Sequence, residues 1–189
     1  MEVIKELNNI TLPEDFNIKY INENEFNEKD VRRAIELYEK DKRENSYKEL
    51  KFTIYSEPRG SARPRVMKTH TYDPSTVYKQ EIRVEVFRQL EELGYSNFTP
   101  IIGEVYLYLD IYRPISKSTP KYKKILMESG ILPVLCKPDV DNYVKLVSDA
   151  LNNILFKDDS QIIDERIRKF YSNTPRYEFT IGYKELNIF

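Results

Sequence analysis

Acidic residues gather around one interior lysine, Lys145, in a short stretch of the chain, Lys137–Ile162. Asp139 and Asp141 come first, Lys145 follows, and a second acidic pair, Asp158-Asp159, comes later. Residues two apart in an extended chain point to the same side, so Asp139 and Asp141 can direct two carboxylates at one cation. Mg²⁺ prefers such oxygen ligands and keeps sites for water and phosphate. The stretch therefore indicates metal-dependent phosphate chemistry, with Mg²⁺ as the cofactor and Mn²⁺ as a substitute.

A predicted helix would place a cation beside these carboxylates. Lys145 lies one turn after Asp141, and Asp149 lies another turn on, so the three can share one face. Lys145 could neutralise charge that develops on the phosphate or orient the attacking water, and the sequence leaves both roles open. A chain reversal after the helix could return one member of Asp158-Asp159 to the same place.

Each feature alone has an ordinary explanation. A D-x-D at a helix start is commonly an N-cap with an acid that the helix dipole favours, and Asp158-Asp159 alone is commonly a turn. The four-residue spacing of Asp141, Lys145 and Asp149 is also typical of a solvated ion-pair face. Their coincidence within one segment favours a site.

The composition excludes several other kinds of site. With one cysteine, Cys136, and one histidine, His70, a single chain has too few residues for a disulfide framework, a Cys/His zinc site or a Ser-His-Asp triad. The 189 residues, 40% hydrophobic and 32% charged, fit a globular protein with a substantial core. We find no apolar stretch of membrane-spanning length and no signal-peptide pattern. We therefore expect a cytoplasmic protein that needs neither a membrane nor a nucleotide cofactor.

Two basic stretches could follow a phosphate backbone although the formal net charge is −1. The stretches Arg59–Lys68 and Arg113–Lys124 contain no acidic residue, and screening confines the relevant field to about 10 Å. Gly60 lets the backbone approach a phosphate closely, and arginine suits phosphate oxygens. A solvated basic loop is the alternative. The predicted DNA-binding residues are Arg59, Arg63, Arg65, Lys68 and Lys137.

The order of predicted elements indicates an α+β fold, a two-layer domain of a mixed β-sheet with helices packed on it. We expect this domain over residues 49–189 and an N-terminal extension with one helix over 1–48. Periodicity predicts helices at 28–45, 76–93, 121–128 and from Asp141 or Asn142 onward, and strands at 49–56, 104–112, 163–170 and 177–183. Residues 58–65 are predicted as a loop.

The segment KPDVDNYVKLVSDALNNILFKDDSQI resembles the core of the RusA family of Holliday junction resolvases, which share K-P-D-x-D-N-x-x-K, D-A-L-N and D-D-x-Q-I. The resemblance implies that Asp139, Asp141 and Asp159 bind magnesium and that Lys145 is catalytic. Similar proteins are homodimeric endonucleases that cut four-way junctions symmetrically, and many are encoded by phages or prophages. The chain departs from the pattern at Asn153, where many relatives carry glycine, and in its long N-terminal segment 1–48.

We therefore expect a magnesium-dependent endodeoxyribonuclease that resolves Holliday junctions in DNA recombination and repair. One alternative is a nuclease for other branched DNA, such as flaps. Another is a non-catalytic protein that binds branched DNA and keeps a vestigial metal site. The preferred cut-site nucleotides, the number of metals, assistance from Asp149 or Asp158, and the role of residues 1–48 stay open.

We predict a homodimer, because a four-way junction is pseudo-symmetric and two coordinated cuts need two sites related by a two-fold axis. Sedimentation of the protein with a junction should give two chains per complex. A single chain bound to the junction would contradict this prediction.

Overall fold

The computed structural model describes residues 6–7, 10–13, 26–44, 47–62, 65–66 and 71–184. The chain divides into two units, one of Met1–Ser46 with Glu185–Phe189 and the other of Tyr47–Lys184. None of the helices in the described residues is long and apolar enough to cross a membrane.

The smaller unit contains the predicted N-terminal helix. Helix α1 spans Glu28–Glu44, and Asn27 Oδ1 accepts a hydrogen bond from the Asp30 backbone N–H at 3.0 Å, which satisfies one free donor of the first turn. Strands β1 (Glu6–Leu7) and β2 (Ile10–Thr11) form an antiparallel pair that the sequence did not predict. Leu12 and Val31 are buried.

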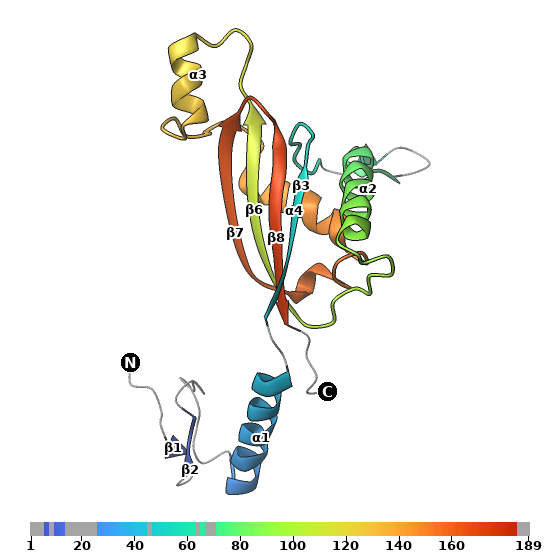
Figure 1. Ribbon diagram of the computed structural model, residues 1–189, viewed down its shortest axis with the longest axis vertical. Helices are drawn as coiled ribbons and strands as arrows, with labels where there is room; N and C mark the ends of the chain where they lie inside the picture. Colours follow the sequence, from blue (N-terminus) through green and yellow to red (C-terminus); the bar gives the residue numbers. More distant parts are fainter. Residues whose placement is uncertain are drawn as a thin grey trace. The chain divides into compact units, whose positions relative to one another are not determined.

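The larger unit is built on a four-stranded mixed sheet (Figure 1). Its strands are β3 (Lys48–Ile54), β6 (Glu104–Pro114), β7 (Ile162–Ser172) and β8 (Arg176–Lys184), in the order β3-β8-β6-β7. Strands β6 and β7 are parallel, and the other neighbours are antiparallel. The predicted α+β fold with a mixed sheet is therefore confirmed.

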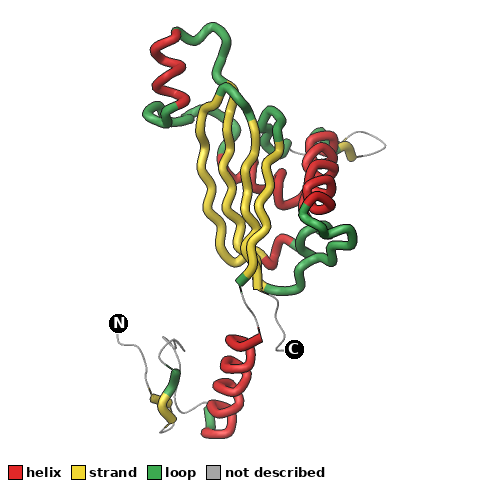
Figure 2. The backbone as a smooth tube through the Cα atoms, viewed as in Figure 1, coloured by secondary structure: helices red, strands yellow, loops and turns green. Residues whose placement is uncertain are grey.

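Two helices pack on one face of this sheet. Helix α2 spans Thr76–Glu92 and helix α4 spans Val140–Leu151. Figure 1 shows α4 behind the strands, and Figure 2 draws all helices as red tubes in the same view. The unit also contains helix α3 (Lys121–Glu128) and the 3₁₀ turn η2 (Asp159–Gln161). Gly94 and Gly130 end α2 and α3 with positive φ angles of 86° and 76°, a conformation that glycine adopts without strain.

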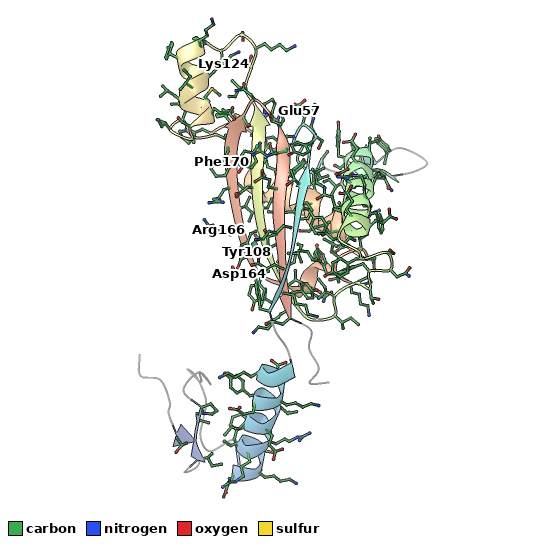
Figure 3. All side chains as sticks on the ribbon, viewed as in Figure 1. Glu57, Tyr108, Lys124, Asp164, Arg166 and Phe170 are labelled. Atoms are coloured by element: carbon green, nitrogen blue, oxygen red, sulfur yellow. The ribbon has the colours of Figure 1, made fainter. Side chains whose placement is uncertain are left out.

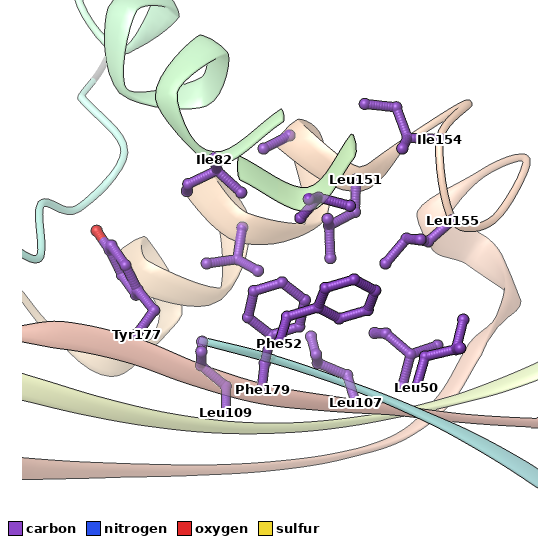
Figure 4. Packing of buried hydrophobic residues seen from close by; sticks show 14 of the residues in the cluster. Leu50, Phe52, Ile82, Leu107, Leu109, Leu151, Ile154, Leu155, Tyr177 and Phe179 are labelled. Atoms are coloured by element: carbon purple, nitrogen blue, oxygen red, sulfur yellow. The ribbon is translucent and has the colours of Figure 1, made fainter. Parts of the chain in front are cut away.

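The core forms where the apolar face of the sheet packs against the apolar faces of α2 and α4. Alternate residues of β6 point toward the helices and are fully buried: Val105, Leu107, Leu109 and Ile111. Figure 4 shows Leu107 and Leu109 below the helix residues Ile82 and Leu151, with Phe52 and Phe179 between the layers. The two phenylalanine rings stack with their centroids 5.2 Å apart. Burial of each large apolar side chain contributes about 1.5–3 kcal/mol, so this layer holds α4 on the sheet.

The opposite face of the sheet carries aromatic and charged side chains. Tyr112 and Phe170 stack with ring centroids 5.2 Å apart, and the Arg176 guanidinium lies 3.7 Å from the Tyr112 centroid. Figure 3 labels Asp164, Arg166 and Phe170 along β7. The alternation in these strands therefore separates an apolar face from a polar one, as the sequence predicted for residues 104–112.

One prediction about local structure is wrong, and another is confirmed only in part. Helix α4 begins at Val140, and its N-cap is Asp139 rather than Asp141 or Asn142. Asp139, with a ψ of 161°, has the extended conformation typical of an N-cap residue. The loop predicted over 58–65 is confirmed over residues 58–62, whereas Arg65 belongs to a short strand, β4 (Arg65–Val66), which pairs with β5 (Thr71–Tyr72).

An ion-pair network links α2 to the end of α4. Lys79 Nζ donates to Asp149 Oδ2 at 2.8 Å and to Asp73 Oδ2 at 2.9 Å, and all three side chains are mostly buried. The hydrogen bond from Lys79 lowers the pKa of Asp73. Burial alone would lower the pKa of Lys79, but the two carboxylates outweigh burial and raise it.

The Arg83 guanidinium strengthens the same link. Its Nε donates to the Ala150 carbonyl at 2.9 Å and its Nη2 donates to the Asp149 carbonyl at 3.1 Å. These carbonyls belong to the last turn of α4, where backbone acceptors lack helical partners. Helix α2 therefore fixes the C-terminal end of α4.

A glutamine of α2 closes the free edge of β3. Gln89 Nε2 donates to the Thr53 carbonyl at 2.7 Å, and Gln89 Oε1 accepts from the Thr53 N–H at 3.1 Å. The side-chain amide thus occupies the positions that a neighbouring strand would take on this edge.

We predict that Lys79→Met destabilises the protein by roughly 2 kcal/mol, because it leaves two mostly buried carboxylates without their cation. The lowered pKa of Asp73 means that its stabilisation is lost as the pH falls below the ordinary value of 3.8. The raised pKa of Lys79 means that its stabilisation is lost as the pH rises above the ordinary value of 10.5. Denaturant melts across pH should show a difference that is constant near neutrality and shrinks at both extremes.

Lys51→Met is the matched control, since Lys51 pairs with Glu49 on the surface, where the two side chains are 73% and 40% exposed. It should change the stability by less than about 0.5 kcal/mol. Equal melting shifts for the two variants would show that the Lys79 network contributes no more than a surface pair.

Candidate active site

Helix α4 and the start of β7 border a hollow of about 590 Å³. Its charged lining residues come from three places in the sequence that the fold brings together. The complete lining is Asp141, Val144, Lys145, Ser148, Asp159, Ile162, Ile163, Asp164 and Glu165.

Helix α4 supplies the cation and one carboxylate. Asp141 and Lys145 are both exposed and lie one turn apart, while Tyr143, Leu146 and Val147 are fully buried against the sheet. The amphipathic pattern therefore turns the charged face of the helix toward the hollow. Asp141 also lies in the first turn, where the helix dipole favours a negative charge.

The two aspartates after α4 have different surroundings. Asp158 caps η2, and its Oδ1 accepts a hydrogen bond from the Ser160 backbone N–H at 3.0 Å, which lowers the pKa of Asp158. Asp159 lies in η2, is exposed, and lines the hollow with Asp141 and Lys145. The carboxylate of Asp158 is therefore used by the local backbone, and that of Asp159 is directed to the hollow.

Asp139 lies at the start of α4 and is not among the residues that line the hollow. Its side chain makes no capping hydrogen bond, so helix capping does not occupy this carboxylate. A lysine of β7 fixes the segment before Asp139, because Lys169 Nζ donates to the carbonyls of Cys136 at 3.1 Å and Pro138 at 3.3 Å. Arg113 of β6 also donates to the Lys137 carbonyl.

Asp149 does not reach the hollow. Although it is spaced to share a face with Lys145, it pairs with Lys79 of α2. The expected row of carboxylate, ammonium and carboxylate along one helix face therefore breaks at its third member, because four-residue spacing drifts around a helix with 3.6 residues per turn.

The basic loop, which is the part of the Arg59–Lys68 stretch at residues 59–62, passes directly over the start of α4. The Ser61 N–H donates to the Asn142 carbonyl at 2.7 Å, and a Cβ at Gly60 would lie 2.7 Å from Pro138 Cβ and 3.1 Å from Asn142 Cβ. The Tyr177 hydroxyl anchors the same loop, because it accepts from the Arg59 N–H at 2.6 Å and donates to the Arg59 carbonyl at 2.8 Å. Gly60 therefore permits a contact that no other residue type allows.

The predicted DNA-binding residues are only partly described. The Arg59 guanidinium is half exposed and pairs with Glu57 at 2.9 Å, and Lys137 is exposed. Arg65 has a described backbone in β4. Arg63, Lys68 and His70 lie outside the described residues.

Comparison with known proteins identifies the family of this chain. The family model for endodeoxyribonuclease RusA matches residues 56–182, which include the hollow and the basic loop. The chain belongs to the RusA endodeoxyribonuclease family. It is also 43% identical over 141 residues to the "uncharacterized protein YqaN" of Bacillus subtilis (strain 168), an alignment that covers 70% of this chain and 94% of that protein.

The departure from the RusA pattern at Asn153 has a structural explanation. Asn153 has a positive φ of 62°, so this position requires the left-handed conformation that glycine adopts freely. Asparagine enters this conformation more readily than most residues with a side chain. The substitution therefore preserves the turn that leads from α4 to η2.

The hollow also contains residues that sequence reasoning missed. Glu165 is exposed and lies on β7 two residues before Ile167, on the same face of the strand. Ile167 packs against the core. The sequence did contain a signal for Glu165, because it is a charged residue at a strand position where alternation favours an apolar one. Ser148 gave no such signal, yet it lines the hollow while only 3% exposed, and its Oγ has no hydrogen-bond partner.

The residues of the hollow fit a hydrated divalent cation. Asp141, Asp159 and Glu165 offer hard oxygen donors, and the unpartnered Ser148 hydroxyl can bond a water or a phosphate oxygen. Among the described residues, however, no three His, Cys, Asp or Glu side chains are grouped closely enough to enclose an ion by themselves. Mg²⁺ suits such an incomplete site, because it keeps several waters and takes phosphate oxygens as ligands.

We predict that Gly60→Ala lowers the cleavage rate of branched DNA by about a hundredfold, since relief of a 2.7 Å contact must displace the rigid ring next to Asp139. The melting temperature should fall moderately as well, as it does when a packed site is overfilled. Single-turnover cleavage with saturating protein measures the rate.

Ser61→Ala is the control, because it alters the same loop and keeps the backbone bond to Asn142. It should cut like the unsubstituted protein. If Gly60→Ala also cuts at the full rate, the contact between the loop and α4 is not needed for activity.

Proposed function

We propose that this RusA-family protein is a Mg²⁺-dependent endonuclease that cuts branched DNA, with the four-way Holliday junction as its substrate and recombination and repair as its context. The observation that carries the proposal is the shared hollow, in which Asp141 and Lys145 of α4 meet Asp159 of η2. These are residue types that phosphodiester hydrolysis needs in one place.

Asp139, Asp141 and Asp159 are the proposed metal ligands. Asp141 and Asp159 line the hollow, and Asp139 lies two residues before Asp141 with a carboxylate that does not cap the helix. A bound Mg²⁺ would neutralise the phosphodiester, lower the pKa of a water and stabilise the leaving oxygen. Mn²⁺ offers the same chemistry with similar oxygen ligands.

Lys145 is the proposed catalytic cation. Its exposed side chain lies on the face of α4 that borders the hollow, so it can contact a non-bridging phosphate oxygen. A cation fixed at that point stabilises the charge that develops as the phosphodiester is attacked. The helix fixes the backbone of Lys145 before the substrate arrives, because the opposite face of α4 is fully buried.

The basic loop and Lys137 are the proposed DNA contacts beside this site. Arg59 and Lys137 flank the loop and the start of α4, and Arg63, Arg65 and Lys68 follow in the sequence. Contacts of arginine and lysine with phosphate attract DNA without reading its sequence. Two protomers related by a two-fold axis would present two such sites to the two strands that are cut.

We predict that Asp139→Asn, Asp141→Asn and Asp159→Asn each reduce cleavage of a synthetic four-way junction by about a hundredfold or more, because each removes a charge that holds the metal. Junction binding without Mg²⁺ should stay the same or tighten, since each change also removes an anion that repels the phosphate backbone. Denaturing gels measure cutting, and mobility shifts measure binding.

Asp158→Asn is the matched control for Asp159→Asn. Asparagine can still accept the hydrogen bond from Ser160, so this variant should cut almost normally. Lys145→Ala should lose cutting but keep the fold, because an exposed helix lysine adds little stability. If all of these variants cut normally, the hollow is not the active site. If the protein cuts flaps but leaves four-way junctions intact, its substrate is another branched DNA. If it binds junctions but cuts no DNA, the alternative of a non-catalytic binding protein with a vestigial metal site is favoured.

A further inference from the structure

The loop that carries Asp159 is fixed at both ends. On one side Leu155 and Phe156 are fully buried, and the Leu155 carbonyl accepts a hydrogen bond from the Ile101 N–H at 2.9 Å. On the other side the loop returns to the sheet through the partly buried Gln161.

Gln161 uses the whole hydrogen-bonding capacity of its side-chain amide. Its Nε2 donates to the carbonyls of Ile101 at 2.9 Å and Gly103 at 2.8 Å, which lie just before β6. Its Oε1 accepts from the backbone N–H groups of Lys157 at 2.8 Å and Asp158 at 3.0 Å. One side chain thus joins the segment that precedes β6 to both residues that precede Asp159.

This pattern requires an amide. Two acceptors lie on one side of the group and two donors on the other, so a carboxylate would meet two carbonyl oxygens and an ammonium would meet two N–H groups. An apolar side chain would leave four backbone groups without this partner. The site carboxylate Asp159 is adjacent to the bonded residue Asp158, so its position depends on this amide.

We propose that Gln161 is a positioning residue for the metal site, holding the backbone of Lys157–Ser160 so that Asp159 faces Asp141 and Lys145 across the hollow. This inference rests on the proposed function, because it assumes that Asp159 binds the metal. Groups that orient a metal ligand without touching the metal commonly change metal affinity by 10–100-fold when they are removed.

The chain contains a matched control in Gln89. This residue also bonds backbone N–H and carbonyl groups through its amide, with Thr53 as its partner, but it lies on α2 against β3 and does not line the hollow. Gln161→Met and Gln89→Met therefore remove the same kind of clamp from two places. A purely structural role predicts that they behave alike.

The experiment titrates Mn²⁺ into each full-length, DNA-free variant and measures the free ion by electron paramagnetic resonance, with the melting temperature recorded in parallel. The Mg²⁺ concentration that gives half-maximal junction cleavage is the second readout. Gln161→Met should raise the Mn²⁺ dissociation constant and the half-maximal Mg²⁺ concentration by about tenfold. Gln89→Met should lower the melting temperature and leave both values unchanged.

The inference would be overturned if Gln161→Met, Gln89→Met and the unsubstituted protein had equal Mn²⁺ dissociation constants and equal half-maximal Mg²⁺ concentrations. Asp159→Asn separates this from failure of the proposed function, because normal cutting and metal binding by that variant would remove Asp159 from the site. Where Gln161→Met does not fold, Gln161→Asn gives the same test, since its amide is one methylene too short to bridge both partners. The same tenfold weakening supports the inference, and unchanged metal values overturn it.

Discussion

The parallel pairing of β6 with β7 is the constraint on which the proposed site depends. Parallel neighbours start at the same end of a sheet, so the chain must return across one face between them, and α4 makes that return. The return brings the start of β7 and the preceding turn beside the exposed face of the helix. Asp141 and Asp159 therefore share a hollow although the rest of α4 and a turn separate them in the sequence.

The acidic residues of this region divide into those with structural partners and those of the proposed site. Asp149 pairs with Lys79 and holds α4 against α2, whereas Asp141, on the same helix, faces the hollow. Asp158 accepts a backbone hydrogen bond, whereas its neighbour Asp159 is left for the hollow. Asp141 thus has an anchored acidic residue on its own helix, and Asp159 has one directly before it in the chain. Changes to the site carboxylates should therefore affect chemistry more than folding.

Periodicity predicted the sheet and its helices because local alternation already separates buried from exposed positions, as in Val105 to Ile111. It did not predict the N-cap at Asp139, since several adjacent residues were competent to cap and tertiary packing chose among them. The partners of Asp149 and the contact of Gly60 with Pro138 depend on which elements become neighbours, and the sequence pattern does not contain that information. Glu165 and Ser148 were missed because strand and helix alternation places core residues at those positions.

The central claim is that this hollow makes the protein a metal-dependent nuclease for branched DNA. The most direct test incubates the unsubstituted protein with a four-way junction and with a linear duplex of the same sequences, with Mg²⁺ or with a chelator. We expect paired cuts in opposite strands of the junction only when Mg²⁺ is present, and an intact duplex. A junction that shifts on a native gel but stays intact with Mg²⁺ or Mn²⁺ would contradict the account.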